Sequence, residues 1–267
     1  MNPIVQLALE EDIGCGDVTT AACVPEGLRA SGRFLAREPL IVAGLDLLPE
    51  IYATPVTLFK HDGEQCADGE TIAAIEAPAR LLLERERVAL NFLQRLSGVA
   101  TAAGRFADAV AGTGCRVLDT RKTTPGLRAL EKKAAAAGGV TNHRMGLWDA
   151  ILIKNNHIAA AGGVRPAIER ARAASRLPIE VEVRTREELR EALDAGAAYL
   201  LLDNLAPAEA ADWVRQVGGR ARVELSGGIM LENVRAYAET GADFVSSGAI
   251  THSARAMDIS FRLQTAS

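Results

Sequence analysis

The chain changes its pattern after Cys115, where short apolar segments begin to alternate with helical ones. Helical segments rich in Ala, Glu and Arg, such as 185–195 and 208–217, separate the apolar segments. Apolar strands joined through helices are typical of βαβ units with a parallel sheet. This alternation constrains the fold most strongly and predicts an α/β protein. Six segments have the character of buried strands: 116–119, 151–154, 179–183, 199–203, 222–226 and 243–247.

The spacing of these strands favours a barrel over an open sheet. The last four recur about every 20 residues, which suits a closed or nearly closed (β/α) barrel. A complete eightfold barrel takes about 250 residues, and six strands are recognisable here. We therefore expect a reduced or incomplete barrel.

The first part of the chain follows a different pattern. Residues 3–11 indicate a short amphipathic helix, and 29–37, 56–60 and 70–76 have the alternation of strands. A helical pattern then runs from Pro78 to about Val110, and Gly98 is expected to interrupt it. This grouping predicts a separate α+β layer rather than a repeat unit.

Composition limits the classes of function. The 267 residues are 48% apolar and 24% charged, as in an ordinary globular protein. We expect neither a secretory signal nor a membrane span, because the first residues lack a basic region and no apolar segment approaches about 18 residues. The four cysteines have no metal-ligand spacing, so we expect reduced thiols and a cytoplasmic location.

Positive charge gathers between Cys115 and His157. This stretch holds eight Lys and Arg against three Asp and Glu, within a chain of net charge −4. A local cationic cluster in an acidic protein indicates a small anionic ligand, whereas nucleic acid would need a broader basic face. We therefore expect no nucleic-acid partner.

Polar residues fall at the ends of the predicted strands. In a parallel barrel these ends meet at one mouth, where active sites are built. Charged residues also commonly flank strands, but six together are hard to explain by packing alone. The residues are Asp119, Lys154, Glu182, Asp203, Ser226 and the pair Ser247-Gly248.

The cations of this set suit carboxylate or phosphate ligands. Arg121 and Arg144 can each bind such a group through two hydrogen bonds, and Lys154 adds a point charge. Each could instead form a surface ion pair. A metal site at His143 and His157 is the weaker interpretation, because no ligand spacing supports it.

The carboxylates permit two interpretations. Glu180 and Glu182 alternate with valines, so both should face the barrel interior. Glu182 and Asp203 could hold Mg²⁺, which uses one or two protein carboxylates together with ligand phosphates. They could instead form internal ion pairs with Lys122 or Lys154, and the two interpretations are compatible.

Glycines after the last strands suggest a phosphate site. Ser226-Gly227-Gly228 ends a strand and is expected to open a helix, which would direct backbone N–H groups at an anion. Ordinary βα turns also use glycines. Together with Ser247-Gly248, however, the pattern fits the phosphate site that many barrels form from their last two loops.

Other classes of function remain open on residues alone. A Lys at a strand end inside a barrel, such as Lys154, could form a Schiff base in an aldolase-like enzyme. A non-catalytic protein that binds an anionic metabolite would also fit the charge pattern.

The motifs as a set resemble the quinolinate phosphoribosyltransferase family. They include D-T-R-K-T-T-P-G-L-R (119–128), G-G-V-T-N-H-R (138–144), I-K-N-N-H (153–157), E-V-E-V (180–183) and E-L-S-G-G-I (224–229), in family order. The resemblance implies an N-terminal α/β sandwich domain (1–112), joined by the C-terminal tail (251–267), and an incomplete, about seven-stranded TIM-like barrel (113–250).

The resemblance also implies an activity in NAD biosynthesis. Quinolinate and phosphoribosyl pyrophosphate would give nicotinate mononucleotide, pyrophosphate and CO₂. A homodimer is implied, in which Arg87 of one subunit reaches the other subunit's barrel. Catalytic roles would fall to Lys122, Glu182, Asp203 and Lys154; the substrate-binding set would be Arg87, Thr120, Arg121, His143, Arg144, Lys154, Ser226, Gly227 and Gly248; Mg²⁺ would lie at Glu182 and Asp203.

Val140 departs from the family pattern. Family members usually carry a third glycine at this position, before the N-H-R triplet. Valine disfavours positive φ, so a different path of this loop is expected.

Overall fold

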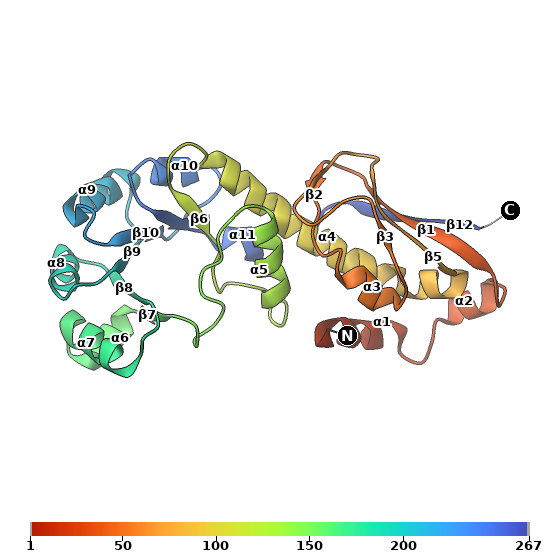
Figure 1. Ribbon diagram of the computed structural model, residues 1–267, viewed down its shortest axis with the longest axis horizontal. Coiled ribbons are helices and arrows are strands. Elements are labelled where there is room, and N and C mark those ends of the chain that lie inside the picture. Colours follow the sequence, from red (N-terminus) through yellow and green to blue (C-terminus); the bar gives the residue numbers. More distant parts are fainter. Residues whose placement is uncertain (1, 266–267) are drawn as a thin grey trace. The chain divides into compact units, whose positions relative to one another are not determined.

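The computed structural model describes residues 2–265 and divides the chain into two compact units (Figure 1). Among the described residues, the first unit comprises 2–104, 124–139 and 254–265, and the second comprises 105–123 and 140–253. The helix α4 (Ala79–Ala109) contains the boundary between them at Gly104. Each unit has its own sheet, and we describe each separately.

The first unit is built on an antiparallel sheet with the strand order β12-β1-β5-β3. A second sheet of two short strands, β2 and β4, accompanies it. The strands are β1 (Arg29–Ala36), β2 (Leu40–Ile41), β3 (Thr57–Leu58), β4 (Gln65–Cys66), β5 (Thr71–Pro78) and β12 (Ile259–Thr265). The helices are α1 (Pro3–Ile13), α2 (Val18–Cys23), α3 (Leu47–Tyr52), α5 (Arg128–Ala137) and the first part of α4.

The alternation read from residues 29–37 forms β1. Ala30, Phe34 and Ala36 are buried, whereas Arg29 and Arg33 are exposed. This pattern is what a strand with one packed face requires. The helix α1 begins where the sequence indicates, because Asn2 caps it by accepting the Ile4 N–H at 3.1 Å.

The expected break in α4 at Gly98 is wrong. The helix runs without interruption from Ala79 to Ala109. Gly98 serves packing instead, since a Cβ there would lie 2.0 Å from the backbone oxygen of Arg255. The glycine therefore permits another segment of the chain to approach the helix closely.

The segment 124–139 belongs to the first unit, whereas the resemblance implies a barrel domain that includes it. Glu131 of α5 is fully buried and accepts hydrogen bonds from Arg95 of α4 at 3.0 and 2.6 Å. Its other oxygen accepts the Thr124 N–H at 2.9 Å. A buried carboxylate needs such partners, and they tie α5 to α4.

The second unit is an incomplete parallel β/α barrel. Its sheet has the order β6-β11-β10-β9-β8-β7, and every pairing is parallel. The strands are β6 (Arg116–Leu118), β7 (Ile151–Ile153), β8 (Ile179–Val183), β9 (Tyr199–Asp203), β10 (Arg222–Ser226) and β11 (Phe244–Ser246). β6 thus pairs with β11, which comes last in the chain among these strands, and the barrel stays open between β6 and β7.

One isolated bridge lies at the open edge of this sheet. Thr141 pairs in parallel with Leu118 at the end of β6. The barrel therefore has six strands and a single bridge where the resemblance implies about seven strands. Because it has fewer strand–helix units than a complete eightfold barrel, the domain needs fewer residues.

Helices follow the strands and lie on the outer side of the curved sheet, as Figure 1 shows for α6 to α10. They are α6 (Asn155–Ala161), α7 (Val164–Ala174), α8 (Arg186–Asp194), α9 (Pro207–Val217), α10 (Val234–Ala238) and α11 (Ala249–His252). Thr185 starts α8 by accepting the Glu188 N–H at 3.1 Å, and Pro207 opens α9. The expected helix directly after Ser226-Gly227-Gly228 is wrong, because α10 begins at Val234.

None of the helices within residues 2–265 has the length and apolar character to cross a bilayer. All four cysteines are free thiols; Cys15 and Cys23 are exposed, and Cys66 and Cys115 are buried.

Candidate active site

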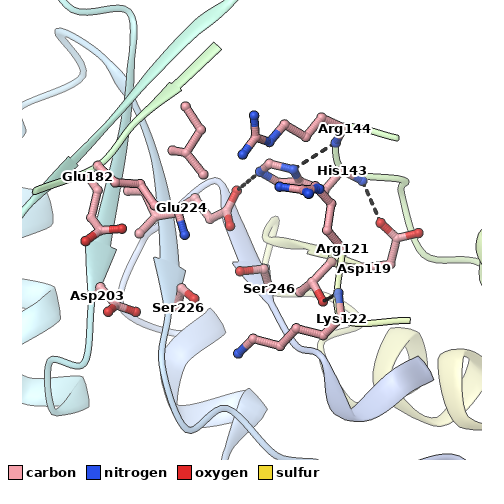
Figure 2. A pocket seen from close by; sticks show the side chains of 14 residues that line it. Asp119, Arg121, Lys122, His143, Arg144, Glu182, Asp203, Glu224, Ser226 and Ser246 are labelled. Atoms are coloured by element: carbon pink, nitrogen blue, oxygen red, sulfur yellow. Dashed lines mark hydrogen bonds and ion pairs between the residues drawn. The ribbon is translucent and has the colours of Figure 1, made fainter. Parts of the chain in front are cut away.

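A cavity of about 240 Å³ lies at the carboxyl ends of the barrel strands (Figure 2). Every strand of the barrel contributes to it, either from its last residues or from the residue that follows. Parallel strands bring these positions to one mouth, as the sequence predicts. The cavity is lined by Asp119, Thr120, Arg121, Lys122, His143, Arg144, Leu152, Lys154, Glu182, Leu201, Asp203, Glu224, Ser226 and Ser246.

Cations come mainly from the two loops on either side of the barrel opening. Arg121 and Lys122 follow β6, and Arg144 precedes β7. The Lys122 N–H donates to Thr120 Oγ1 at 3.0 Å, so Thr120 shapes this loop. Burial and the nearby charge of Arg121 lower the pKa of Arg144. Two guanidinium groups this close to each other favour an anion between or beside them.

Asp119 holds in place the loop before β7, which carries His143 and Arg144. Its carboxylate is fully buried and accepts the His143 N–H at 2.8 Å and the Asn142 side-chain amide at 2.7 Å. Hydrogen bonds to a buried carboxylate are stronger than those between neutral groups. Asp119 therefore fixes where the His143 side chain enters the cavity.

His143 lies against two carboxylates on the barrel wall. Its Nε2 is 3.0 Å from Glu180 Oε2 and 3.4 Å from Glu224 Oε2. Burial opposes a charge on the ring, but the hydrogen bonds and negative charges of both glutamates outweigh it and raise the pKa of His143 to about 10. Burial also raises the pKa of Glu180 to about 7. His143 and Glu180 therefore each retain a proton above the pH at which they would ordinarily lose it.

The same three residues have the ligand types of a metal site. The contacts of the imidazole argue against that role. The Arg144 N–H donates to Nδ1 at 2.8 Å when the ring is neutral, so that Nε2 carries the ring proton, and in the cationic ring Nε2 is protonated as well. A protonated Nε2 cannot bind a metal. We therefore interpret the cluster as a proton-sharing hydrogen-bond network.

Glu182 and Asp203 lie on the same side of the cavity, as Figure 2 shows. One oxygen of each is engaged, Glu182 Oε1 by Arg184 at 2.9 Å and Asp203 Oδ2 by the Asn204 amide at 2.7 Å. Within the described residues, the alternative ion pairs of these carboxylates with Lys122 or Lys154 do not form. Each carboxylate keeps a second oxygen available, which fits a hard cation such as Mg²⁺.

Some of the expected site residues lie outside the cavity lining. His157 caps the start of α6 by accepting the Lys154 N–H at 2.9 Å. Ser247 is buried and donates its hydroxyl to Ile229 O at 2.6 Å, and the preceding Ser246 lines the cavity instead. Gly227 and Gly248 flank the cavity lining without belonging to it. Arg87 lies on α4 in the first unit.

Comparison with known proteins identifies the chain. Residues 17–97 match the family model of the quinolinate phosphoribosyl transferase N-terminal domain, and residues 99–262 match that of its C-terminal domain. The chain belongs to the quinolinate phosphoribosyltransferase family.

Relatives that align with nearly the whole chain support this assignment. The probable nicotinate-nucleotide pyrophosphorylase (carboxylating) of Bacillus subtilis is 43% identical and aligns over 94% of this chain and 89% of its own. The nicotinate-nucleotide pyrophosphorylase (carboxylating) of Mycobacterium leprae is 42% identical, over 97% of this chain and 95% of its own. The solved structure of the Francisella tularensis nicotinate-nucleotide pyrophosphorylase has a TM-score of 0.95 at 35% identity, over 98% of this chain and 95% of that one.

Several residues that line this cavity are not among the site residues expected from the sequence. Glu224 alternates with Val223 and Leu225 and therefore shares a face with Ser226, by the same rule that placed Glu182. This alternation can be read from the sequence alone and would have indicated Glu224. Ser246, Leu152 and Leu201 carried no comparable signal, because apolar and serine residues in strands are ordinary.

Val140 is accommodated without backbone strain. Its side chain is buried, and it is not among the described residues with positive φ. The neighbouring Gly139 adopts the left-handed conformation instead, with φ of 98°. The loop thus reaches Asn142 and His143 with a valine at this position.

Proposed function

We propose that the protein transfers a phosphoribosyl group to quinolinate, yielding nicotinate mononucleotide, pyrophosphate and CO₂ for NAD biosynthesis. One observation supports this above all: a barrel mouth that gathers Arg121, Lys122, Arg144 and Lys154 together with Glu182 and Asp203, in a chain matched by both family domains. Both substrates are polyanions, and this arrangement offers them cationic side chains and two carboxylates that can hold a cation.

The bond changes follow from the chemistry of the two substrates. The pyridine nitrogen forms a bond to C1 of the ribose as the C1–O bond to pyrophosphate breaks. The ring nitrogen then carries a positive charge, which stabilises the electron pair left on C2 when CO₂ departs, and C2 takes up a proton. Fixed charges around the reacting atoms stabilise the charge that develops.

We assign the two carboxylates of quinolinate to the guanidinium groups. Arg121 and Arg144 supply the planar forks that carboxylates match, and the NH of His143 is held at their side by Glu180 and Glu224. Thr120 supports this wall through its contact with the Lys122 backbone. Lys122 and Lys154 are assigned to the pyrophosphate and the ribose.

Mg²⁺ is assigned to Glu182 and Asp203. Their available oxygens fit a cation that keeps several waters and is bound partly by phosphate oxygens. When bound, the ion neutralises charge on the pyrophosphate. The residues themselves hold it and face the ribose hydroxyls from β8 and β9.

The 5′-phosphate is assigned to the ends of β10 and β11. Ser226 lines the cavity, and Gly227 follows it with φ of 97°. A Cβ on Gly227 would lie 2.3 Å from Asn204 Oδ1, so glycine is required for the turn to pass Asn204.

The deciding experiment supplies the purified protein with quinolinate, phosphoribosyl pyrophosphate and Mg²⁺, and follows nicotinate mononucleotide and CO₂ together. Formation of both in equal amounts is expected. A parallel reaction with nicotinate tests the dicarboxylate assignment. Product from nicotinate alone would overturn that assignment, and no product from either acid would overturn the proposed reaction.

We also propose a homodimer in which Arg87 completes the partner's site. Mixing the variants Arg87→Ala and Lys122→Ala tests it, because a mixed dimer contains one site with both residues intact. Random exchange at equal amounts should restore about a quarter of wild-type activity. Activity that stays at the level of the separate variants would contradict a shared site. The cytoplasmic location stays a prediction.

A further inference from the structure

Gly248 occupies a backbone conformation that any residue could adopt. Its φ of −74° and ψ of −17° are those of a right-handed helix. A glycine is therefore not required there for the turn itself, unlike Gly227 with its positive φ. The reason for a glycine must lie in the surrounding space.

That space is taken by the side chain of Lys122. A Cβ on Gly248 would lie 2.9 Å from Lys122 Cδ, and equally close to Cδ2 and Nε2 of the His252 ring. All three residues belong to the second unit. Both neighbours are side-chain atoms beyond Cβ rather than backbone, so an added methyl group would move them rather than unfold the backbone. The lysine stem thus passes too close to Gly248 for a residue with Cβ to fit there unchanged.

The same loop also holds the backbone of Lys122. Thr251 is fully buried, and its hydroxyl donates to the Lys122 carbonyl oxygen at 2.8 Å. The loop is itself anchored, because the Ser247 N–H donates to Leu118 O at 3.2 Å and the Ser247 hydroxyl to Ile229 O at 2.6 Å. The loop after β11 thus contacts Lys122 at two points, one on its backbone and one along its stem.

We propose that Gly248 and Thr251 are positioning residues that direct the Lys122 ammonium group into the cavity. Thr251 fixes the backbone from which the side chain starts, and Gly248 leaves the space through which its stem passes. This role differs from direct phosphate binding by Gly248. It rests on the proposed function, in which Lys122 contacts phosphoribosyl pyrophosphate.

The test is a double-mutant cycle read by substrate affinity. The dissociation constant of phosphoribosyl pyrophosphate with Mg²⁺ is measured by calorimetry for the wild type, Gly248→Ala, Lys122→Ala and the double variant. Gly248→Ala should weaken binding about tenfold in the wild-type chain, as expected for a misplaced ligand group, and have no further effect once Lys122 is removed. Equal weakening in both backgrounds would overturn the proposal and favour a direct contact between Gly248 and phosphate.

Two further variants separate the neighbours of Gly248. Adding His252→Ala to Gly248→Ala should not restore affinity, because the stem of Lys122 stays displaced; full restoration would assign the effect to His252 and overturn the proposal. A melting temperature for Gly248→Ala close to that of the wild type is expected, since only side-chain ends move.

Thr251 is tested by a matched pair. Thr251→Ser keeps the hydroxyl and Thr251→Val keeps the shape without it. Valine should lower affinity and kcat in the wild-type chain but not in the Lys122→Ala chain, and serine should restore both. Equal effects of the two substitutions would contradict the role of the hydroxyl. If Lys122→Ala itself binds as tightly as the wild type, the proposed role of Lys122 fails, and this outcome is distinct from the others.

Discussion

At the scale of single residues, the site depends on buried carboxylates that act through their neighbours. Asp119 fixes the backbone at His143, and Glu180 and Glu224 hold the imidazole from the barrel wall. Each is buried or nearly so, where hydrogen bonds to charge are strong and unpaired groups are costly. The imidazole of His143 and the loop that carries it are thus held in place by anionic groups.

Asp119→Asn should weaken both the loop and catalysis. The amide can accept at only one atom, so one of the two donors from Asn142 and His143 loses its partner. We expect a loss of about 1–3 kcal/mol in the free energy of unfolding and at least about a tenfold fall in kcat/KM for quinolinate. Urea unfolding and steady-state kinetics measure these effects. Asp212→Asn, in an exposed ion pair with Arg186, is the matched control and should change neither.

His143 should give the protein a pH-dependent stability. Glu180 and Glu224 face its ring, and Arg121 and Arg144 lie on the loops beside it. Its pKa is raised from 6.5 to about 10, so its contribution to stability is complete below the lower value and is lost as the pH rises to the higher one. The melting temperature of the wild type should therefore fall more steeply from pH 6.5 to 10 than that of His143→Gln. Parallel curves would contradict this linkage.

At the scale of elements, α4 carries glycines for packing rather than for flexibility. Gly98 and Gly104 both lie within the helix, where glycine costs about 1 kcal/mol relative to alanine. At each, a close neighbour occupies the position of the missing Cβ. For Gly98 that neighbour is the backbone of Arg255, and for Gly104 it is Cδ1 of Ile41 at 2.4 Å.

Alanine at these two positions should have unequal effects. The Arg255 backbone cannot move without shifting the chain that leads into β12, so Gly98→Ala should cost about 2–3 kcal/mol in the free energy of unfolding. Ile41 can change its side-chain conformation, so Gly104→Ala should cost less than about 1 kcal/mol after the gain in helix propensity. Urea unfolding of both variants measures the difference. Equal losses in the free energy of unfolding would contradict the prediction that the Arg255 backbone resists displacement more than the Ile41 side chain does.

At the scale of the whole molecule, segments from opposite ends of the chain belong to the same compact unit. The C-terminal strand β12 pairs with β1 along its full length, from Ala30↔Thr265 to Ala36↔Ile259. The Phe261 ring packs over Gly32, where a Cβ would lie 2.1 Å from it, and its centroid is 4.9 Å from that of Phe34. The strand at Ile259–Thr265 therefore completes the sheet of the first unit.

Truncation after Asp258 should destabilise the first unit selectively. Without β12, β1 becomes an open edge and loses the Phe261 contact. Hydrogen exchange should show lost protection in β1 and β5, while the barrel strands retain theirs because they form a separate compact unit. Phe261→Ala should reproduce part of this loss. Uniform loss of protection in both units would contradict their independence.

Much of this architecture was predictable because it depends on local patterns. The parallel strands follow from apolar segments of about five residues between helices, and β8, β9 and β10 have the bounds that the sequence indicates. Strand alternation placed Glu182, and the strand-end rule placed Asp119, Lys154, Asp203 and Ser226, at the cavity. Applied to β10, alternation would also have placed Glu224 there.

Local patterns in the chain thus specify the incomplete barrel, the position of its mouth and most of the charged groups there. How those groups are held follows only from the folded structure. It assigns α5 to the first unit through Glu131 and Arg95, keeps α4 intact at Gly98, and brings Gly248 against Lys122. These features depend on contacts between residues far apart in the chain, and local sequence patterns do not predict such contacts.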